Sequence, residues 1–392
     1  MINYDDILNR QVAAIPRSGI RRFFDIASEM KDCISLGVGE PDFVTPWDIR
    51  DGAIKAIQAG KTQYTSNAGL IELRTAVSEY LNGRFSLTYD PKSEIIITIG
   101  ASEAIDLALR TVVNPGEEVL VPAPSYVSYQ PNVALVNGVS VPLPLTEKNG
   151  FKLTPEIIEA AITKKTKAII IPYPNNPTGA IMEKSDLEAI VDVIIKNNLI
   201  VISDEIYAEL TYGKRHVSIA SLPNMRERCI VINGFSKAFA MTGWRQGYIC
   251  GPREIIDCCY KIHQYTIMCA PTFSQYASLK ALKNGFEDDF ETVEEMRKSY
   301  DMRRRFLVHE FNEMGMDCFE PEGAFYVFPS VKKYSLTGDE FAEKLLYSQK
   351  VAVVPGSAFG EGGEYFVRCS YATGIKQLQI ACKRIKTFIS TL

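Results

Sequence analysis

Histidine is scarce in this sequence, and several common functional motifs are missing from it. The three histidines, His216, His263 and His309, are not at metal-ligand spacing. No G-x-x-x-x-G-K-[ST] segment is present, which excludes a P-loop. Acidic residues (47) outnumber basic residues (43), and this balance argues against a nucleic-acid-binding surface. We therefore expect no metal site and no nucleic-acid partner, and we interpret each histidine as a surface or hydrogen-bonded core residue.

Long apolar runs are also absent. No run approaches the roughly 20 residues that a transmembrane helix needs, so we expect no membrane partner. The nine cysteines form no C-x-x-C pair and their number is odd, which is typical of free thiols in a reducing compartment. Residues 1–6 are polar and acidic, unlike the start of a signal peptide. The composition predicts a cytoplasmic globular protein.

The middle of the chain alternates short apolar segments with longer amphipathic ones. Strands are expected at residues 95–99, 119–121, 168–171, 199–203, 229–232 and 247–250, and helices at about 102–113, 154–162 and 185–197. Thr154 and Ser185 are the expected N-caps of the last two helices. The strands are rich in β-branched residues without polar alternation, which indicates burial on both faces. This pattern predicts an α/β fold whose large domain holds a mostly parallel, doubly wound sheet.

The character of the chain changes after about residue 272. Helical patterns extend over residues 273–314, 337–349 and 374–392, and short strands are expected at 323–328 and 365–369. This combination predicts a smaller α+β domain. We expect residues 1–44 to form an N-terminal segment that joins the small domain, residues 45–285 the large cofactor-binding domain, and residues 286–392 the small C-terminal domain.

Two segments approach known motifs without matching them. Residues 37–42 begin like a dinucleotide-binding fingerprint, but the third glycine is missing and Pro41 would disturb the turn into a helix. Residues 234–238 miss the nucleophile elbow of serine hydrolases because Ala238 replaces its last glycine. A serine hydrolase would also need a histidine for its triad, and few are available.

Lys237 is the first candidate for chemistry. It follows a predicted strand and the polar residues 233–236, and apolar residues flank it in the sequence. A lysine that is partly desolvated beside another cation can lose its proton and act as a nucleophile. The spacing alone leaves three roles open, namely a catalytic amine, one half of a buried ion pair, and a surface charge.

Other polar residues lie at the carboxyl ends of predicted strands, where ligands bind in open α/β sheets. Asp204 directly follows an apolar strand, so it either caps a helix or pairs with a cation such as a protonated ring nitrogen. Residues 100–102 open a helix whose free N–H groups suit a phosphate, and Ser236 and Arg245 could complete that anion site. Together these residues offer an amine, a carboxylate and an anion site.

These segments resemble the class I and II aminotransferases of fold type I, which depend on pyridoxal phosphate. The resemblance rests on residues 98–104, 174–179, 203–207 and 236–245, and on residues 35–42, 64–69, 73–74, 355–359 and 366–370 in the same order. It covers nearly the whole chain. Residues 18–21, Tyr212 and residues 263–265 are especially similar to bacterial enzymes that act on N-acetyl-diaminopimelate or on aromatic amino acids.

The resemblance implies a role for each matching residue. Lys237 would form the Schiff base with the cofactor, Asp204 would pair with the pyridine nitrogen, and Tyr207 would hydrogen-bond O3′ together with Asn176. The remaining cofactor contacts are implied at Ala101, Ser102, Tyr126, Ser236, Arg245 and Tyr64. Among them, Tyr126 would stack on the ring, and Tyr64 would reach the phosphate of the neighbouring subunit, which implies a homodimer.

The substrate side is implied in the same way. Arg368 would bind the α-carboxylate, with Asn176 and the backbone at Gly37 beside it. The expected reaction moves an amino group from an L-amino acid to a 2-oxo acid, with 2-oxoglutarate as the expected acceptor. The donor is left open among N-acetyl-L,L-diaminopimelate, aromatic and aspartate-like amino acids. Arg17, Arg21 and Arg22 either read a distal carboxylate or are solvated charges.

Three alternatives stay open at this point. A pyridoxal-phosphate-dependent C–S β-lyase would use Lys237 and Asp204 identically but would expel a sulfur leaving group. A non-catalytic regulator on this fold usually carries an added basic DNA-binding domain, and the sequence shows none. A serine hydrolase would lack the yellow colour that bound pyridoxal phosphate gives.

Overall fold

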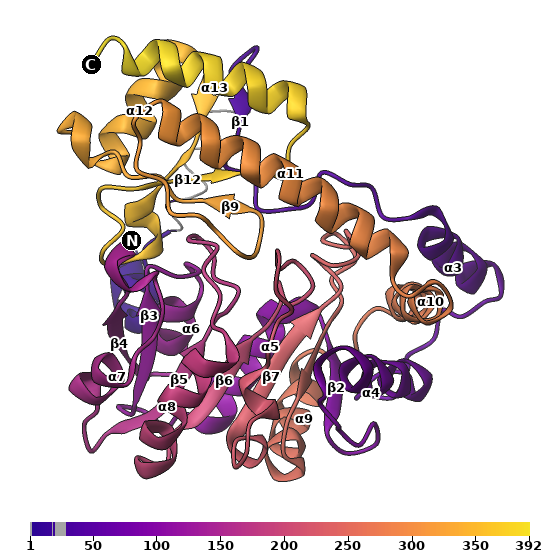
Figure 1. The fold of residues 1–392 in the computed structure, drawn as a ribbon. Helices are drawn as coiled ribbons and strands as arrows, with labels where there is room; N and C mark the ends of the chain where they lie inside the picture. The colour runs from indigo at the N-terminus through magenta and orange to yellow at the C-terminus, as the bar shows by residue number, and fades with distance from the viewer. Residues whose placement is uncertain (1, 18, 20–28) are drawn as a thin grey trace.

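The computed structural model describes residues 2–17, 19 and 29–392, and a seven-stranded sheet lies at its centre (Figure 1). Its strands are ordered β2 (Ile95–Thr98), β8 (Gly247–Cys250), β7 (Cys229–Gly234), β6 (Ile200–Asp204), β5 (Thr166–Ile171), β3 (Glu118–Ala123) and β4 (Val139–Pro144). From β7 to β4 all neighbours pair in parallel, whereas β8 is antiparallel to both β2 and β7. The expected α/β class with a mainly parallel sheet is confirmed.

Helices cover both faces of this sheet because alternate residues of each strand point to opposite sides. Ile169 packs in one hydrophobic cluster with residues of α8 (Lys184–Lys196), while Ile170 packs in another with residues of α5 (Gly100–Val112). The other helices around the sheet are α3 (Trp47–Gln58), α4 (Ile71–Phe85), α6 (Tyr129–Leu135), α7 (Pro155–Ala161), α9 (Arg253–Thr266) and α10 (Thr272–Asp288). Burial on both faces accounts for the continuous apolar runs in the strands.

A second, smaller region lies beside the carboxyl edge of the large sheet (Figure 1). It contains the antiparallel sheet β11 (Val354–Pro355), β12 (Val367–Ser370) and β9 (Tyr326–Val327), and the parallel pair β1 (Ile34–Ser35) and β10 (Val351–Ala352). Helices α11 (Glu291–Glu313), α12 (Gly338–Gln349) and α13 (Ile375–Ile389) accompany these strands. Through β1, residues near the start of the chain join this C-terminal region.

Short helical elements complete the described chain. They are α1 (Arg10–Ala14) and the 3-10 turns Tyr4–Asp6, Glu147–Asn149, Ile219–Ser221, Arg226–Arg228, Lys332–Tyr334 and Gly356–Phe359. Within the described residues, no helix combines the length and apolar character needed to cross a bilayer. In the same part of the chain, no group of three or more His, Cys, Asp or Glu side chains is arranged to hold a metal ion.

Several local expectations are confirmed and two are wrong. Thr154 caps α7 by accepting a hydrogen bond from the backbone of Ile157. Ser185, in contrast, lies inside α8, whose N-cap is Glu183 in a capping box with Asp186. The strand expected at residues 323–328 shortens to β9, where only two residues pair with β12. The predicted domain limits at residues 44/45 and 285/286 stay a proposal.

Close packing places the first turn of α5 directly against β8. A Cβ atom on Gly247 would lie 2.6 Å from the carbonyl carbon of Gly100 and 2.7 Å from the backbone nitrogen of Ala101. Gly100 itself has a φ of +71°, which a residue with a side chain adopts at a cost. The two glycines therefore fix where the N-terminus of α5 points.

Replacing Gly247 with alanine should disturb this contact. The added methyl group cannot fit without a backbone shift, and such overpacking typically costs about 1–3 kcal/mol in the free energy of unfolding. Urea unfolding of Gly247→Ala would measure the loss. Gly243→Ala is the matched control, because a Cβ atom at Gly243 meets no heavy atom within 4 Å. Equal stability of the two variants would contradict the packing argument.

Candidate active site

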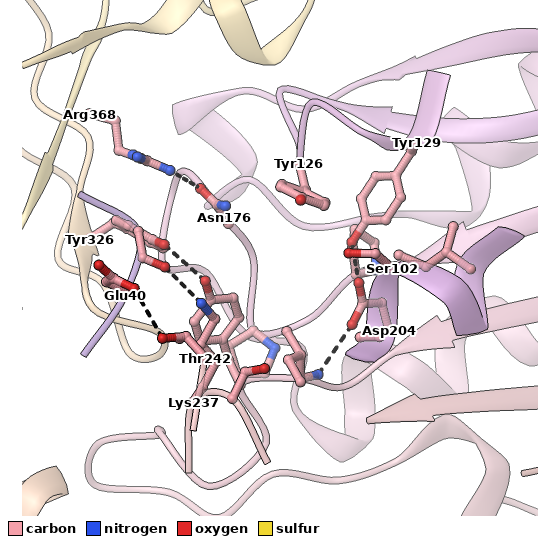
Figure 2. A pocket seen from close by; sticks show the side chains of 18 of the residues that line it. Glu40, Ser102, Tyr126, Tyr129, Asn176, Asp204, Lys237, Thr242, Tyr326 and Arg368 are labelled. Carbon is pink, nitrogen blue, oxygen red and sulfur yellow. Dashed lines mark hydrogen bonds between the residues drawn. The ribbon is translucent and has the colours of Figure 1, made fainter. Parts of the chain in front are cut away.

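Most of the predicted site residues line one cavity of about 310 Å³ at the carboxyl edge of the large sheet (Figure 2). The predicted residues in its wall are Ala101, Ser102, Tyr126, Asn176, Asp204, Tyr207, Ser236, Lys237, Arg245 and Arg368. They come from β6, from α5 and from the loops that follow β3, β5, β6 and β7, and Arg368 is added by β12 of the smaller region. Residues that are far apart in the sequence are thus brought to a single site.

Lys237 lies in the turn after β7 and extends into this cavity. Its Nζ atom donates a hydrogen bond to the backbone carbonyl of Gly39 at 2.7 Å. Burial lowers the pKa of Lys237 to about 8, a shift that the charge of Glu40 opposes and the charges of Arg368 and Arg245 reinforce. An amine with this pKa is available as a nucleophile near neutral pH, and a purely surface role is wrong.

Asp204 ends β6 with its carboxylate buried in the cavity wall. The hydroxyl of Tyr129 donates to Oδ2 at 2.8 Å, and the backbone N–H of Ile206 donates to Oδ1 at 3.2 Å (Figure 2). Burial raises the pKa of Asp204 to about 6, against the lowering effect of these two hydrogen bonds and of Lys237. A turn rather than a helix follows Asp204, so its expected alternative role as a helix N-cap is wrong.

Arg368 is almost fully buried on β12, and its partners are neutral. Nη1 donates to Oδ1 of Asn176 at 2.8 Å, and Nη2 donates to the carbonyl oxygen of Gly37 at 2.6 Å. Nε has no hydrogen-bond partner, and no carboxylate within the described residues forms an ion pair with Arg368. A buried guanidinium without a counter-charge is suited to an incoming carboxylate, and the alternative of a structural ion pair finds no support.

An anion-binding corner lies at the N-terminus of α5. The first turn of the helix contributes Ala101 and Ser102, and Arg245 and Ser236 line the cavity beside them. A Cβ atom on Gly100 would lie only 2.7 Å from Nη2 of Arg245, so glycine at this position lets the guanidinium lie close to the helix end. Free N–H groups, the helix dipole and a guanidinium together favour a phosphate here.

Two predicted residues lie outside the cavity wall. Gly37 contributes through its carbonyl oxygen, which accepts the hydrogen bond from Arg368. Tyr64 is 79% exposed in this single chain, and its proposed contact with a neighbouring subunit stays a prediction. Of the three arginines considered for a distal carboxylate, Arg17 is exposed and does not line the cavity, and Arg21 and Arg22 lie outside the described residues.

Four polar wall residues were not among those predicted from the sequence, namely Glu40, Tyr129, Thr242 and Tyr326. Tyr129 follows Tyr126 by three residues, a spacing that could have suggested a shared site, and Glu40 belongs to a segment rejected as a dinucleotide motif. Nothing in the local pattern singles out Tyr326, which lies in a short apolar strand. Its hydroxyl is 2.9 Å from that of Tyr207.

His263 and His309 behave as expected, whereas the buried Nε2 atom of His216 has no hydrogen-bond partner among the described residues. His263 hydrogen-bonds Glu103 at 2.6 Å and His216 lies 3.0 Å from a carboxylate oxygen of Glu205, while His309 is exposed. No histidine is present in the wall of the cavity beside Ser236. The site therefore gives the serine hydrolase alternative no support.

Comparisons with known proteins agree on one family. The family model for "Aminotransferase class I and II" matches residues 31–385. The putative aminotransferase YugH of Bacillus subtilis is 53% identical over 97% of this chain and 98% of its own length. An aspartate aminotransferase of Pyrococcus abyssi is 48% identical over 94% of this chain and 95% of its own.

Other relatives carry different substrate names. A probable N-acetyl-LL-diaminopimelate aminotransferase of Bacillus subtilis is 43% identical over 98% of this chain and 96% of its own length. The solved structure of an aromatic aminotransferase from Pyrococcus horikoshii superposes with a TM-score of 0.90 at 45% identity, covering 95% of this chain and 99% of that one. With a family match over most of its length and full-length relatives above 40% identity, this chain belongs to the class I and II aminotransferases.

Proposed function

We propose that this aminotransferase transfers the amino group of an L-amino acid to a 2-oxo acid with pyridoxal phosphate bound covalently to Lys237. The observation that carries the proposal is the grouping of three charged side chains in one cavity. These are an amine of lowered pKa at Lys237, a buried carboxylate at Asp204 and a guanidinium without a counter-charge at Arg368. The comparisons give the C–S β-lyase alternative no support.

The members of this family use pyridoxal phosphate, and the cavity has the groups to hold it. Lys237 would bind its aldehyde, and the corner formed by Ala101, Ser102, Ser236 and Arg245 would hold its phosphate. The absence of a side chain at Gly100 leaves that corner open. When bound, the cofactor supplies an electron sink for the negative charge that develops at the substrate Cα atom.

The ring would be held by polar and aromatic contacts. Asp204 would pair with the ring nitrogen, and Tyr129 and Ile206 already fix both oxygens of its carboxylate. A cation opposite Asp204 would lower its pKa below the value of about 6 that burial produces, so the carboxylate would stay ionised. Tyr207 and Asn176 would hydrogen-bond O3′, and Tyr126 would lie on the ring face.

The substrate would be oriented by Arg368. Its guanidinium can bind a carboxylate through two parallel hydrogen bonds, with Asn176 and the backbone at Gly37 beside it. This fork would hold the Cα–H bond across the ring plane and within reach of Lys237. Once displaced by the substrate amine, Lys237 would accept the proton from Cα, and its lowered pKa suits a general base near neutral pH.

Substrate identity and assembly belong to the same proposal. The relatives are named for aspartate, aromatic and N-acetyl-diaminopimelate substrates, so we propose a donor from these three groups and 2-oxoglutarate as acceptor. The presence of Ser102 in the phosphate helix, where some aspartate-accepting relatives carry lysine, argues against a simple aspartate enzyme. We also propose a cytoplasmic homodimer in which Tyr64 reaches the neighbouring cavity.

Lys237→Ala should abolish both the absorption of covalently bound cofactor and turnover. Losing the proton-transferring amine alone is expected to slow the reaction by about 10²–10⁴-fold. Absorption spectra and glutamate formation from 2-oxoglutarate would measure the two effects. The control is Lys261→Ala, an exposed lysine on α9 paired with Asp257. A Lys237→Ala protein that stays yellow through dialysis and remains active would refute the covalent attachment of the cofactor to Lys237.

The rate of cofactor capture by the cofactor-free protein should rise with pH. Only the neutral amine condenses with an aldehyde, and with a pKa of about 8 roughly a tenth of Lys237 is neutral at pH 7. We expect the rate to increase about tenfold between pH 6 and pH 7 and to level off above about pH 8.5. Stopped-flow absorbance would follow the reaction.

Glu40→Gln is the control for this pH dependence. The carboxylate of Glu40 raises the pKa of Lys237, so its removal should move the midpoint of the rate profile to lower pH. A midpoint near 10.5, the ordinary lysine value, would mean that Lys237 is not desolvated as described.

Arg368→Lys should raise KM for every substrate that carries an α-carboxylate. Lysine keeps the charge but loses the two-point fork, which we expect to cost roughly 10- to 100-fold in KM. A panel of amino donors with 2-oxoglutarate, read as glutamate formed, would measure the effect and rank the donors. Arg110→Ala, which removes an exposed pair with Asp106, is the control. An increase confined to one donor would contradict the proposed role.

A further inference from the structure

Tyr326 is a wall residue to which the proposed reaction assigns no role. It lies in β9, and its side chain is 1% exposed. Its hydroxyl oxygen is 2.9 Å from the hydroxyl oxygen of Tyr207, and its ring lies against Arg368, whose Cζ atom is 4.3 Å from the ring centroid. One side chain thus touches both the proposed O3′ donor and the proposed carboxylate-binding group. Figure 2 shows Tyr326 and Arg368 in the cavity wall.

We propose that Tyr326 is a positioning residue with two separable functions. Its hydroxyl orients the proton of Tyr207 toward the cofactor, and its ring holds the plane of the Arg368 guanidinium. This inference rests on the proposed function, because it assumes that Tyr207 meets O3′ and that Arg368 meets the α-carboxylate.

The hydroxyl function follows from the number of protons available. Each phenol has one proton to donate, and burial raises the pKa of Tyr207 and of Tyr326, so both are protonated in the working range of pH. When Tyr207 donates its proton to O3′, the hydrogen bond between the two phenols must run from Tyr326 to Tyr207. That donation polarises the Tyr207 hydroxyl and strengthens its bond to O3′.

The ring function follows from the surroundings of Arg368. The guanidinium contacts two aromatic rings, with Cζ 4.3 Å from the centroid of Tyr326 and 4.9 Å from that of Phe359. Its Nη atoms bond Asn176 and Gly37 at the edge. Gly39 makes room for the tyrosine, because a Cβ atom there would come within 3.1 Å of its hydroxyl oxygen. Contacts with two rings thus restrict the orientation of the Arg368 guanidinium and of the N–H groups that would bind a carboxylate.

The hydroxyl is tested by the pH dependence of the absorption of the holoenzyme. While the nitrogen that joins Lys237 to the cofactor is protonated, its charge stabilises the neighbouring O3′ anion. Once this nitrogen has lost its proton, the O3′ anion depends more on the hydrogen bond from Tyr207. Tyr326→Phe should weaken the hydrogen bond from Tyr207 to O3′ and so disfavour the form in which this nitrogen is deprotonated. We therefore expect the variant to raise the pKa of the nitrogen that joins Lys237 to the cofactor by about 0.5–1 unit. The control is Tyr173→Phe, which removes a buried hydroxyl bonded to the carbonyl of Phe151.

The ring is tested by substrate binding in the same proteins. Tyr326→Phe keeps the ring and should leave KM within about twofold of the wild type. Tyr326→Leu removes it and should raise KM for all donors by about 5- to 10-fold. If Tyr326→Leu does not fold, Phe359→Leu removes the second ring that contacts Arg368 and carries the same expectation for KM.

The outcomes separate this inference from the proposed function. A cofactor absorption band that Lys237→Ala retains would overturn covalent attachment at Lys237, and the role of Tyr326 with it. If the absorption of the wild type changes with pH and the midpoint of Tyr326→Phe lies within 0.2 unit of the wild-type midpoint, the hydroxyl function alone would be overturned. Equal KM increases in Tyr326→Phe and Tyr326→Leu would overturn the ring function. A raised midpoint with unchanged KM in Tyr326→Phe, and a raised KM in Tyr326→Leu, supports both.

Discussion

Lys237 and Arg368 share one cavity in this fold, and neutral carbonyl oxygens rather than carboxylates accept their hydrogen bonds. Lys237 donates to the carbonyl of Gly39, and Arg368 donates to the carbonyl of Gly37 and to the side-chain oxygen of Asn176. Neutral acceptors satisfy the donors but leave the positive charge in place. The site therefore suits anionic ligands, and burial, reinforced by the positive charges of Arg368 and Arg245, lowers the pKa of Lys237.

The strand topology explains why so many chemical groups meet at this point. The parallel strands β5, β6 and β7 end at the same edge, so the residues that follow them are neighbours in space although they are 28 to 61 positions apart in the sequence, as the positions of Asn176, Asp204 and Lys237 show. Adjacent to them, β8 runs in the opposite direction and supports the first turn of α5 through Gly247. The smaller region then closes the cavity with Arg368.

Much of this arrangement could be predicted from the sequence, since buried parallel strands carry a strong apolar signal and the chemical residues follow them directly. The strand at residues 247–250 has the bounds that the sequence predicts. Its antiparallel direction cannot be predicted from a local sequence pattern. The cap of α8 was misassigned because a glutamate–aspartate capping box replaced the expected serine. Tyr326 was missed because its role depends on long-range contacts with Tyr207 and Arg368.

The segment that follows β1 links the chemistry to the rest of the architecture. Because β1 pairs with β10, Gly37 and Gly39 extend from the C-terminal region, whereas Lys237 extends from the large sheet. The bond between Lys237 and Gly39 is thus a tether across the two halves of the molecule. If the nitrogen of Lys237 is bound to the cofactor, as the proposed function requires, this hydrogen bond is lost, and residues 37–39 would then be held less firmly against the large sheet.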